Sequence, residues 1–401
     1  MANLPPKSSD YRSLWSLRPG VTYLNHGSFG PSPLSVIAAR QAWIERLEAE
    51  PMDFFVRQLE PLLAEARQRL APFCGTSAEN LLFVDNATFG MNIVAQSITL
   101  ATGDEVLLTD HEYGAVTRIW RRVCERTGAS LKIARLPEPF TSAEEVVASI
   151  IAAVTPQTRV VVVSHVTSPT AVILPVQDIC RALRQAHPRL RICIDGPHAP
   201  GIVPLELDRL DCDFYAASGH KWLSGPFGSG FLYVHPRAQR LLQPLVVSWG
   251  ASLSGDSASW RDEFTWLGTR DPSPFLALPA ALDFLDEIGI ETFRKQTHDL
   301  ARYARGKIVS LTGLEPLVPD SPAWYGPMIA LPLPDSLPEP ETGHMHPLQA
   351  ALWDRARIEA PVTSWRGRRF LRVSCHLYNS KADVEALVEA LRGLLQGGAA
   401  R

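Results

Sequence analysis

Short apolar and β-branched runs alternate with stretches of helical spacing between residues 105 and 234. Residues 160–163 are consecutive valines, and an uninterrupted apolar run is typical of a strand buried on both faces of a parallel sheet. The last two runs are closely spaced, and the final one is compatible with antiparallel pairing. The pattern predicts an α/β fold with a mostly parallel central sheet and strands at residues 105–109, 130–136, 159–165, 190–194, 212–216 and 230–234.

The spacing of hydrophobic positions changes after about residue 271. Two long segments of helical spacing, 274–288 and 290–311, lead into a proline-rich stretch, and a strand and a helix are predicted beyond it at 369–374 and 381–395. We therefore expect a large α/β domain over residues 26–285. A smaller α+β domain is expected over residues 286–401, with residues 1–25 packed on it.

Composition and charge exclude several classes of function. The 401 residues carry a formal charge of −3, from 39 basic and 42 acidic residues, and show no long basic run, so neither nucleic acid nor a membrane surface is the expected partner. No apolar run reaches the ~18 residues of a membrane span, and no targeting segment is visible. The six cysteines form no CxxC pair, so no metal site is expected and a reduced cytoplasm fits best.

Two charged residues follow predicted strands at the edge where ligands bind in open α/β sheets. Asp195 comes directly after the strand at 190–194, and Lys221 follows the strand at 212–216. A lysine that forms a Schiff base and a carboxylate that holds a pyridine nitrogen protonated suit a pyridoxal phosphate site. Taken singly, the aspartate could be a cap and the lysine a solvated surface group.

A third element could hold the phosphate. Residues 85–92 open an apolar helix, so backbone N–H groups and the Thr88 hydroxyl form an anion site at its N-terminus. Asn and Thr also cap helices where no ligand binds, so this signal is weak alone.

The chain resembles the class V aminotransferase family of fold type I pyridoxal-phosphate enzymes, and within it the isopenicillin N epimerase-like branch. The resemblance covers nearly the whole chain. The motifs that carry it are Tyr-Leu-Asn-His-Gly-Ser-Phe-Gly at 23–30, Asp-His-Glu-Tyr-Gly-Ala at 110–115, Asp-Gly-Pro-His-Ala at 195–199, Trp-Leu-Gly-Thr-Arg-Asp at 266–271 and Leu-Arg-Val-Ser at 371–374.

This resemblance implies roles for individual residues. Lys221 matches the Schiff-base lysine, Asp195 the partner of the pyridine nitrogen, and His198 a group that bonds the phenolic oxygen of the cofactor. Tyr113 falls where relatives stack a ring on the cofactor; the alternative is a core tyrosine. The positions that match phosphate contacts are Ala87, Thr88, Ser218, His220 and Thr269.

Thr269 matches a contact that relatives receive from the other subunit, so the resemblance implies a homodimer with shared active sites. For the substrate, Arg372 matches the arginine that grips a carboxylate, with a surface ion pair as the alternative reading. Asn25 lies in an expected specificity loop. Arg57 is a further candidate at the mouth of the site, against a solvated helix charge.

The family also contains cysteine desulfurases, whose nucleophilic cysteine lies on a loop before the carboxylate-binding arginine. Residues 358–367 contain no cysteine, and Cys375 reads as a core thiol, so persulfide chemistry is not expected. Ser168 stands where desulfurases tend to have Asn.

The resemblance implies an enzyme that binds an amino acid as an external aldimine and forms a carbanion at Cα, with Lys221 as general base. Epimerisation is the preferred outcome. The alternatives are a C–S lyase that expels a β-substituent, an aminotransferase, and a pseudoenzyme that keeps the fold without turnover.

Overall fold

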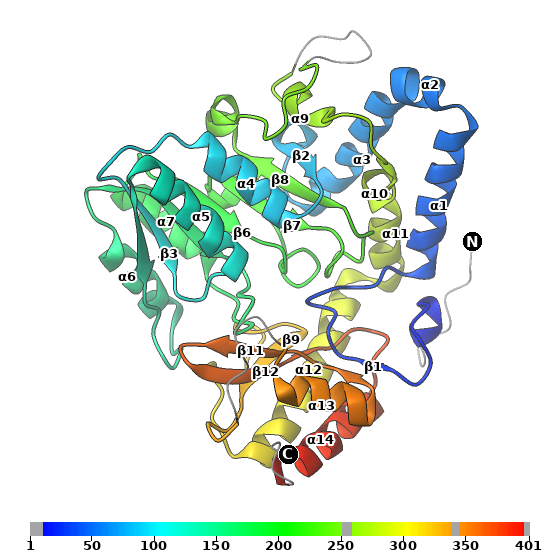
Figure 1. Cartoon of the computed structure of the whole chain (residues 1–401), viewed down its shortest axis with the longest axis vertical. Coiled ribbons are helices and arrows are strands. Elements are labelled where there is room, and N and C mark those ends of the chain that lie inside the picture. The colour runs from blue at the N-terminus through cyan, green and yellow to red at the C-terminus, as the bar shows by residue number, and fades with distance from the viewer. Residues whose placement is uncertain (1–10, 251–258, 338–344, 397–401) are drawn as a thin grey trace.

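The structure, a computed structural model, describes residues 11–250, 259–337 and 345–396 (Figure 1). Its centre is a seven-stranded sheet. In spatial order the strands are β2 (Leu81–Val84), β8 (Gly230–Val234), β7 (Phe214–Ser218), β6 (Arg191–Asp195), β5 (Thr158–Ser164), β3 (Glu105–Thr109) and β4 (Ser130–Ala134). β8 runs antiparallel to β7 and β2, and the other pairs are parallel.

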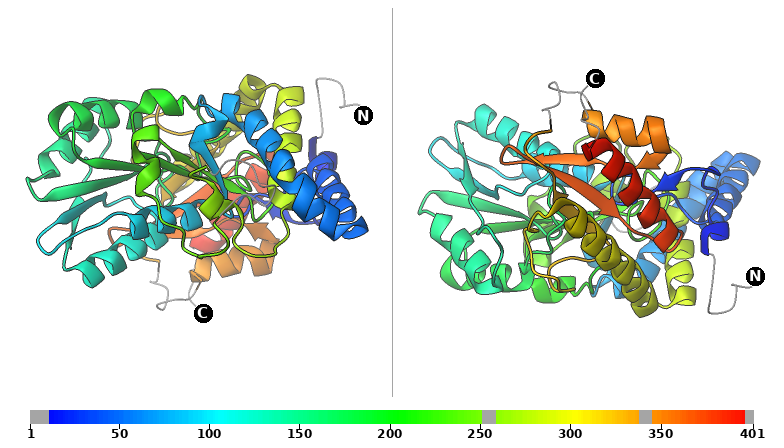
Figure 2. Two further views of the ribbon diagram at one scale, coloured as in Figure 1. Left: turned by 90° about the horizontal axis from the view of Figure 1, so that it is seen from above. Right: turned by 90° about the horizontal axis from the view of Figure 1, so that it is seen from below.

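Helices cover both faces of this sheet (Figure 2). The helical segments around it are α1 (Leu34–Ala49), α2 (Pro51–Asp53), η2 (Phe54–Gln58), α3 (Leu59–Phe73), η3 (Ala78–Asn80), α4 (Ala87–Ser97), α5 (Gly114–Thr127), α6 (Ala143–Ala153), α7 (Val176–Ala186), α8 (Leu207–Leu210), η4 (Pro236–Leu241), α9 (Asp262–Thr265), α10 (Ser273–Leu276) and α11 (Leu278–Ile288). In β5, Val160 and Val162 pack with α4 and α5, whereas Val161 and Val163 pack with α3, α6, α7 and α11. Burial on both faces explains the uninterrupted apolar run.

Local capping signals set where two of these helices begin. The Asn86 side chain accepts a hydrogen bond of 2.9 Å from the Phe89 N–H at the start of α4. Ser142 Oγ accepts one of 3.2 Å from the Glu145 N–H at the start of α6. Because α4 starts directly after β2, its N-terminus lies at the carboxyl end of that strand.

The C-terminal part is built on a smaller antiparallel sheet. Its strands in order are β11 (Val362–Trp365), β12 (Arg368–Ser374) and β9 (Met328–Pro332). They share an apolar cluster with the helices α12 (Ile290–Thr312), α13 (Pro347–Ala356) and α14 (Lys381–Gln396). The N-terminal segment, with η1 (Tyr11–Leu14), joins this part through the parallel pairing of β1 (Thr22–Tyr23) with β10 (Ile358–Glu359). None of the described helices combines the length and the apolar character needed to cross a membrane.

The structure adds elements that the periodicity did not predict. Within the proline-rich stretch, β9 forms an edge strand of the small sheet, where it is buried along its whole length and pairs with β12. The predicted boundary near residue 285 falls inside α11, and the chain turns into α12 at Gly289, whose φ is 83°. The division into two domains stays a prediction, and residues 1–10 of the predicted N-terminal segment lie outside the described residues.

Candidate active site

A cavity of about 580 Å³ lies at the carboxyl ends of the parallel strands, between the central sheet and the C-terminal part. Asp195 ends β6 and Ser218 ends β7, so both side chains are delivered to this edge by the parallel topology. Nine of the predicted site residues line this cavity: Ala87, Thr88, Tyr113, Asp195, His198, Ser218, His220, Lys221 and Arg372.

The surroundings of Lys221 favour its neutral amine form. Its Nζ lies 3.1 Å from Nε2 of the buried His198, and Trp222 Nε1–H donates to His198 Nδ1 at 3.4 Å. Because Nδ1 accepts this bond, the single ring proton of a neutral imidazole must be on Nε2. The Nε2–H group then donates a hydrogen bond to the lysine nitrogen, which accepts it. Burial and the positive charge of Arg372 lower the pKa of Lys221, against the opposing charge of Asp195. An unprotonated amine is the form that attacks a carbonyl.

Asp195 faces the cavity, and its carboxylate has no hydrogen-bond partner among the described residues. The residue is only 2% exposed, and no described residue donates a hydrogen bond to its carboxylate. Burial and the negative charge of Glu112 raise its pKa, while Lys221 opposes the shift. A buried carboxylate that lines a cavity and lacks a donor fits a ligand with a cationic N–H group, such as a protonated pyridine nitrogen.

The start of α4, where the sequence predicts an anion site, borders the cavity. The Ala87 N–H already donates to Ser218 Oγ at 3.0 Å, so that hydroxyl and the N–H act as a pair. Thr88, the second residue of α4, lines the cavity beside them. The Nδ1 atom of His220 is buried without a hydrogen-bond partner, which leaves a nitrogen available to a phosphate oxygen.

Arg372 projects into the cavity from β12 and is held by two serines. One terminal nitrogen donates to the Ser168 carbonyl at 2.9 Å, and the other contacts Ser28 Oγ. Burial lowers the pKa of Arg372 to about 10, so the guanidinium stays charged. The first nitrogen also donates to Ser168 Oγ at 3.3 Å, so the serines use three of the five N–H donors, and the Nε–H and one terminal N–H remain. Ser28 was given no role from sequence, although it lies within the motif at 23–30.

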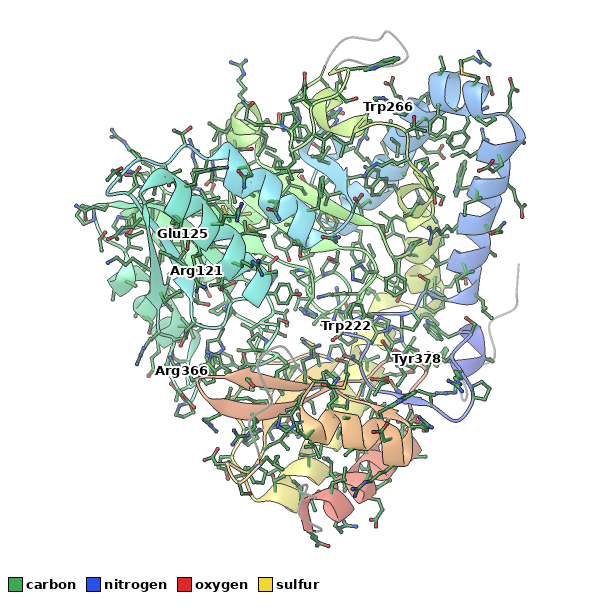
Figure 3. All side chains as sticks on the ribbon, in the orientation of Figure 1. Arg121, Glu125, Trp222, Trp266, Arg366 and Tyr378 are labelled. Carbon is green, nitrogen blue, oxygen red and sulfur yellow. The ribbon has the colours of Figure 1, made fainter. Side chains whose placement is uncertain are left out.

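The hairpin of β11 and β12 carries Arg372 across to the large sheet. Thr363 Oγ donates to the Pro169 carbonyl at 2.7 Å, and Trp365 Nε1 donates to the Asp110 carbonyl at 2.8 Å. Arg366, at the hairpin end labelled in Figure 3, pairs with Asp110 and with Glu138 at 3.1 Å. These contacts fix one wall of the cavity.

Glu112 is a buried carboxyl that sequence reasoning left without a role. It accepts hydrogen bonds from the Ser164 N–H at 3.0 Å, from Ser164 Oγ at 2.6 Å and from Thr109 Oγ at 2.6 Å. Burial outweighs these bonds and raises the pKa of Glu112 to about 7. Ser164 pairs with Asp195 in the register of β5 and β6. Through its hydrogen bonds to Ser164, Glu112 is therefore held close to the Asp195 carboxylate. Its only sequence signal was an acidic residue between a predicted strand and Tyr113.

Three predicted residues lie outside this cavity. Arg57 is exposed and pairs with Asp53, its neighbour four residues earlier, because both lie on one helical surface. Asn25 is buried, with its Oδ1 unpartnered. Thr269 is exposed, as a residue that serves a partner's site would be. The roles of Arg57, Asn25 and Thr269 stay predictions.

All six cysteines are buried, and none lines the cavity. Burial raises the pKa of the Cys375 thiol, which keeps it protonated in the small core. Cys375 is therefore not placed to act as a nucleophile.

Comparison with known proteins gives one family. A family model described as aminotransferase class-V matches residues 22–387. Isopenicillin N epimerase of Amycolatopsis lactamdurans is 41% identical over 392 residues, which cover 94% of this chain and 96% of that protein. The isopenicillin N epimerase of Streptomyces clavuligerus is 38% identical over 390 residues, with the same coverage of 94% and 96%.

More distant relatives carry other descriptions. A putative L-cysteine desulfhydrase of Oryza sativa subsp. japonica is 29% identical over 417 residues and covers 94% of this chain and 84% of that protein. The solved complex of the cystine C–S lyase C-DES with cysteine persulfide superposes with a TM-score of 0.81 at 24% identity, over 93% of this chain and 98% of that chain. This likeness establishes the fold type I architecture.

Proposed function

The chain belongs to the class V aminotransferase family, and on that premise we propose that it removes and returns the Cα proton of an amino-acid-derived substrate, as an epimerase. The observation that carries the proposal is that Lys221, partly buried and with a lowered pKa, lines the same cavity as the carboxylate of Asp195, to which no described residue donates. The two epimerase relatives, at 41% and 38% identity over 94% of the chain, favour this outcome over other reactions at Cα.

The cofactor is pyridoxal 5'-phosphate, and the residues present fit it. Asp195 would hold the ring nitrogen, His220 and Thr88 the phosphate, and Lys221 the aldehyde carbon. When bound, this cofactor supplies an electron sink that stabilises negative charge at the substrate Cα.

The chain's own residues provide the binding and proton-transfer groups. Arg372, held by Ser28 and Ser168, has donors left for the substrate carboxylate. Lys221, once released from the cofactor, is a neutral amine that can take the Cα proton, because its surroundings disfavour the charged form. Tyr113 lines the same cavity and is the candidate for a second proton carrier. Either Lys221 alone removes and returns the proton, or Tyr113 returns it on the opposite face. The Tyr113→Phe variant distinguishes these possibilities, since an enzyme that needs both groups loses inversion while keeping Cα exchange.

The first alternative is elimination of a β-substituent, as in a C–S lyase. The desulfhydrase relatives favour it, since that reaction begins with the same loss of the Cα proton. Persulfide transfer is disfavoured because no cysteine lines the cavity. Transamination is the third enzymatic option. A pseudoenzyme would lack one of the lysine, the carboxylate or the phosphate contacts, and all three are present.

One substrate panel distinguishes these reactions. Purified holoenzyme is offered L- and D-amino acids and amino-acid-derived peptides in deuterated solvent, with assays for Cα exchange, stereochemical inversion, pyruvate and sulfide release, and amino transfer. Epimerisation predicts exchange together with inversion and no keto product. Lys221→Ala is the control and should lose exchange, inversion and the visible absorbance of the lysine-bound cofactor. Sulfide and pyruvate release without inversion would overturn the epimerase proposal in favour of the lyase.

We also propose that the protein acts as a homodimer with shared active sites. Phe29 and Phe227 are 65% and 48% exposed although Phe29 lines the cavity, so a second copy would cover apolar surface at its mouth. Mixing the Lys221→Ala and Thr269→Ala chains tests this arrangement. A mixed dimer would contain one fully intact site if Thr269 serves the partner's cavity, and would regain activity that neither variant has alone. An active monomer in solution would contradict the proposal.

A further inference from the structure

A cluster of buried rings lies against the backbone of Lys221, at the junction of the two parts of the molecule. It consists of His26, Trp222, His376 and Tyr378, each at most 2% exposed. Figure 3 shows the labelled Trp222 and Tyr378 at this junction. His26 belongs to the motif at 23–30, and the proposed function assigns it no role. Its contacts therefore need an explanation of their own.

The hydrogen bonds of His26 determine its tautomer. Nε2 lies 2.9 Å from the carbonyl oxygen of Lys221, and Nδ1 lies 3.0 Å from the hydroxyl of Tyr378. A carbonyl oxygen can only accept, so Nε2 carries the proton and donates it. Nδ1 is then the acceptor, and the Tyr378 hydroxyl donates to it. The chain of bonds runs in one direction, from Tyr378 through His26 to the peptide carbonyl of the lysine.

The surroundings keep this arrangement neutral and rigid. The ring of His376 stacks on that of His26 with centroids 4.0 Å apart and planes 22° from parallel. Burial lowers the pKa of His26 to about 3, and the neighbouring His220 adds to the effect. At neutral pH, Nδ1 therefore stays unprotonated and continues to accept from the Tyr378 hydroxyl. The chain also approaches closely at Gly30, where an added Cβ would lie 2.5 Å from both His26 Nε2 and the His220 carbonyl oxygen.

We propose that His26 is a positioning residue that holds the peptide carbonyl of Lys221, and so sets where the lysine Nζ lies relative to His198 and the cofactor. Tyr378 supports it by fixing the tautomer. Because Tyr378 follows β12 in the C-terminal part and His26 follows β1, the contact also ties the lysine backbone to elements outside the central sheet. This inference rests on the proposed function, since the position of Nζ matters only if the lysine binds the cofactor.

Two polar variants of similar chemistry test the position of the donor. The amide nitrogen of Gln in His26→Gln can occupy the place of Nε2 and still reach the Lys221 carbonyl, whereas the shorter His26→Asn side chain can reach only the place of Nδ1. We expect His26→Gln to bind pyridoxal phosphate within about twofold of wild type, and His26→Asn to bind it about tenfold more weakly. The pH dependence of the bound cofactor's absorbance should shift in His26→Asn and return in His26→Gln.

Borohydride trapping followed by mass spectrometry measures the fraction of Lys221 joined to the cofactor, independently of turnover. Tyr378→Phe should show an intermediate loss, because it frees the His26 tautomer without removing the ring. Tyr233→Phe is the matched control, since the hydroxyl of this buried residue bonds Asp208 at 3.1 Å and neither residue is among those that line the cavity. The melting temperature of each apoprotein monitors folding, and if His26→Asn does not fold, Tyr378→Phe decides the question alone.

The outcomes separate the two proposals. Wild-type protein that traps no cofactor on Lys221 would overturn the proposed function. Wild-type protein that does trap it, combined with equal trapping and equal affinity in His26→Gln, His26→Asn and Tyr378→Phe, would overturn the positioning role while leaving the function intact.

Discussion

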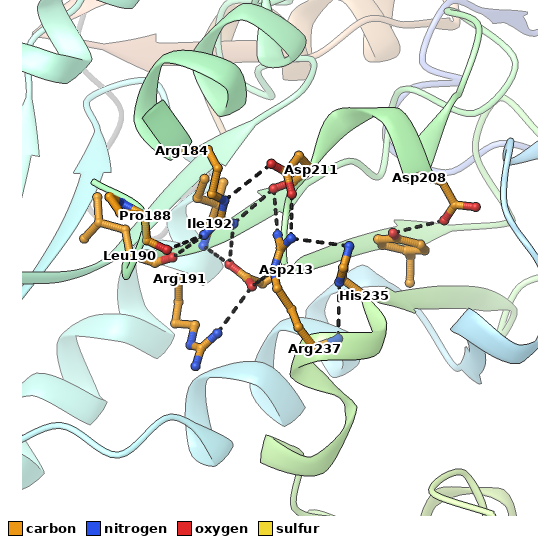
Figure 4. Close-up of polar contacts among 11 residues, drawn as sticks. Arg184, Pro188, Leu190, Arg191, Ile192, Asp208, Asp211, Asp213, His235 and Arg237 are labelled. Carbon is orange, nitrogen blue, oxygen red and sulfur yellow. Dashed lines mark hydrogen bonds and ion pairs between the residues drawn. The ribbon is translucent and has the colours of Figure 1, made fainter. Parts of the chain in front are cut away.

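Two aspartates at opposite ends of the central sheet are almost equally buried, at 2% for Asp195 and 0% for Asp213, yet their partners differ completely. Asp213, at the amino end of β7, accepts from Arg184 at 3.0 Å, from Arg237 at 2.8 Å and from the Ile192 N–H at 2.8 Å (Figure 4). Burial would raise the pKa of Asp213, but these donors outweigh it and hold the pKa below its usual value.

Asp195, at the carboxyl end of β6, receives no such donor from the described chain, and its pKa is raised. At the amino end of the sheet, ion pairs with arginines therefore offset the cost of burying the Asp213 charge. At the carboxyl end, no described residue does this for Asp195. A buried charge that its own chain satisfies stabilises the fold, and one that it leaves unsatisfied is available to a ligand.

The largest effect is expected on activity, from Asp195→Asn. Removing the charge beside the cofactor ring should reduce Cα exchange by about 10³-fold, because the ring nitrogen loses its counter-charge. The free energy of unfolding of the apoprotein should stay the same or rise, since an unpartnered buried carboxylate is costly. NMR exchange rates and urea unfolding measure the two quantities, and exchange near the wild-type rate would break the comparison.

Asp213→Asn should produce the opposite pattern. We expect the apoprotein to lose about 3 kcal/mol of unfolding free energy, because several buried arginine contacts lose their charge partner. Exchange per folded molecule should remain at the wild-type rate. Asp211→Asn is the matched control: its side chain is 44% exposed, so its ion pair with Arg237 should contribute less than about 1 kcal/mol. Loss of exchange in folded Asp213→Asn protein would show that the two ends are not separate in function.

The pH dependence of apoprotein stability sharpens the contrast. The pKa of Glu112 is raised from 4.5 to about 7, so the folded state holds a proton that the unfolded state releases, and stability falls as pH rises through this window. Glu112→Gln should remove up to about 3 kcal/mol of that dependence. Asp213 has a lowered pKa, so its contribution is present above 3.8 and is lost as pH falls below that value. Urea titrations between about pH 3 and 8 measure how the free energy of unfolding changes with pH for each variant. An unchanged slope in Glu112→Gln would contradict the assignment.

The smallest effects are expected at the substrate end. Arg372→Lys should raise KM for amino-acid substrates about tenfold, because a lysine loses the planar pair of donors. Ser28→Ala should raise KM by only about twofold to threefold, since it removes one of the three hydrogen bonds that orient the guanidinium. Steady-state kinetics measure both changes, and an unchanged KM in Arg372→Lys would move the carboxylate site elsewhere.

Much of the central sheet could be predicted from the sequence because most of its strands, with the exception of the edge strand β4, are buried on both faces. The valines at 160–163 identify β5 without any tertiary information, and the apolar run at 230–234 coincides with β8. The strand β9 is no shorter than β3 or β8, but it was missed because prolines flank and end it, and proline argues against a strand.

The candidate site divides in the same way. Asp195 and Lys221 could be proposed from the sequence because each lies at or shortly after the end of a strand, and parallel strands end at one edge. The residues that position the site's side chains could not be predicted in this way. Ser28 and Ser168 orient Arg372 from segments far apart in the chain, and the bond from His26 to the Lys221 carbonyl spans 195 positions.

The sequence by itself determined the α/β alternation, the family and the cavity residues whose place follows from strand ends, because these depend on local periodicity and on short motifs. The tertiary structure alone decided which buried charges are paired. Asp195 and Asp213 both flank strands of the same sheet, but only the packing of α7 and η4 against its amino end brings Arg184 and Arg237 to Asp213. Pairing depends on distances across the fold, and these are not encoded in any single segment of the chain.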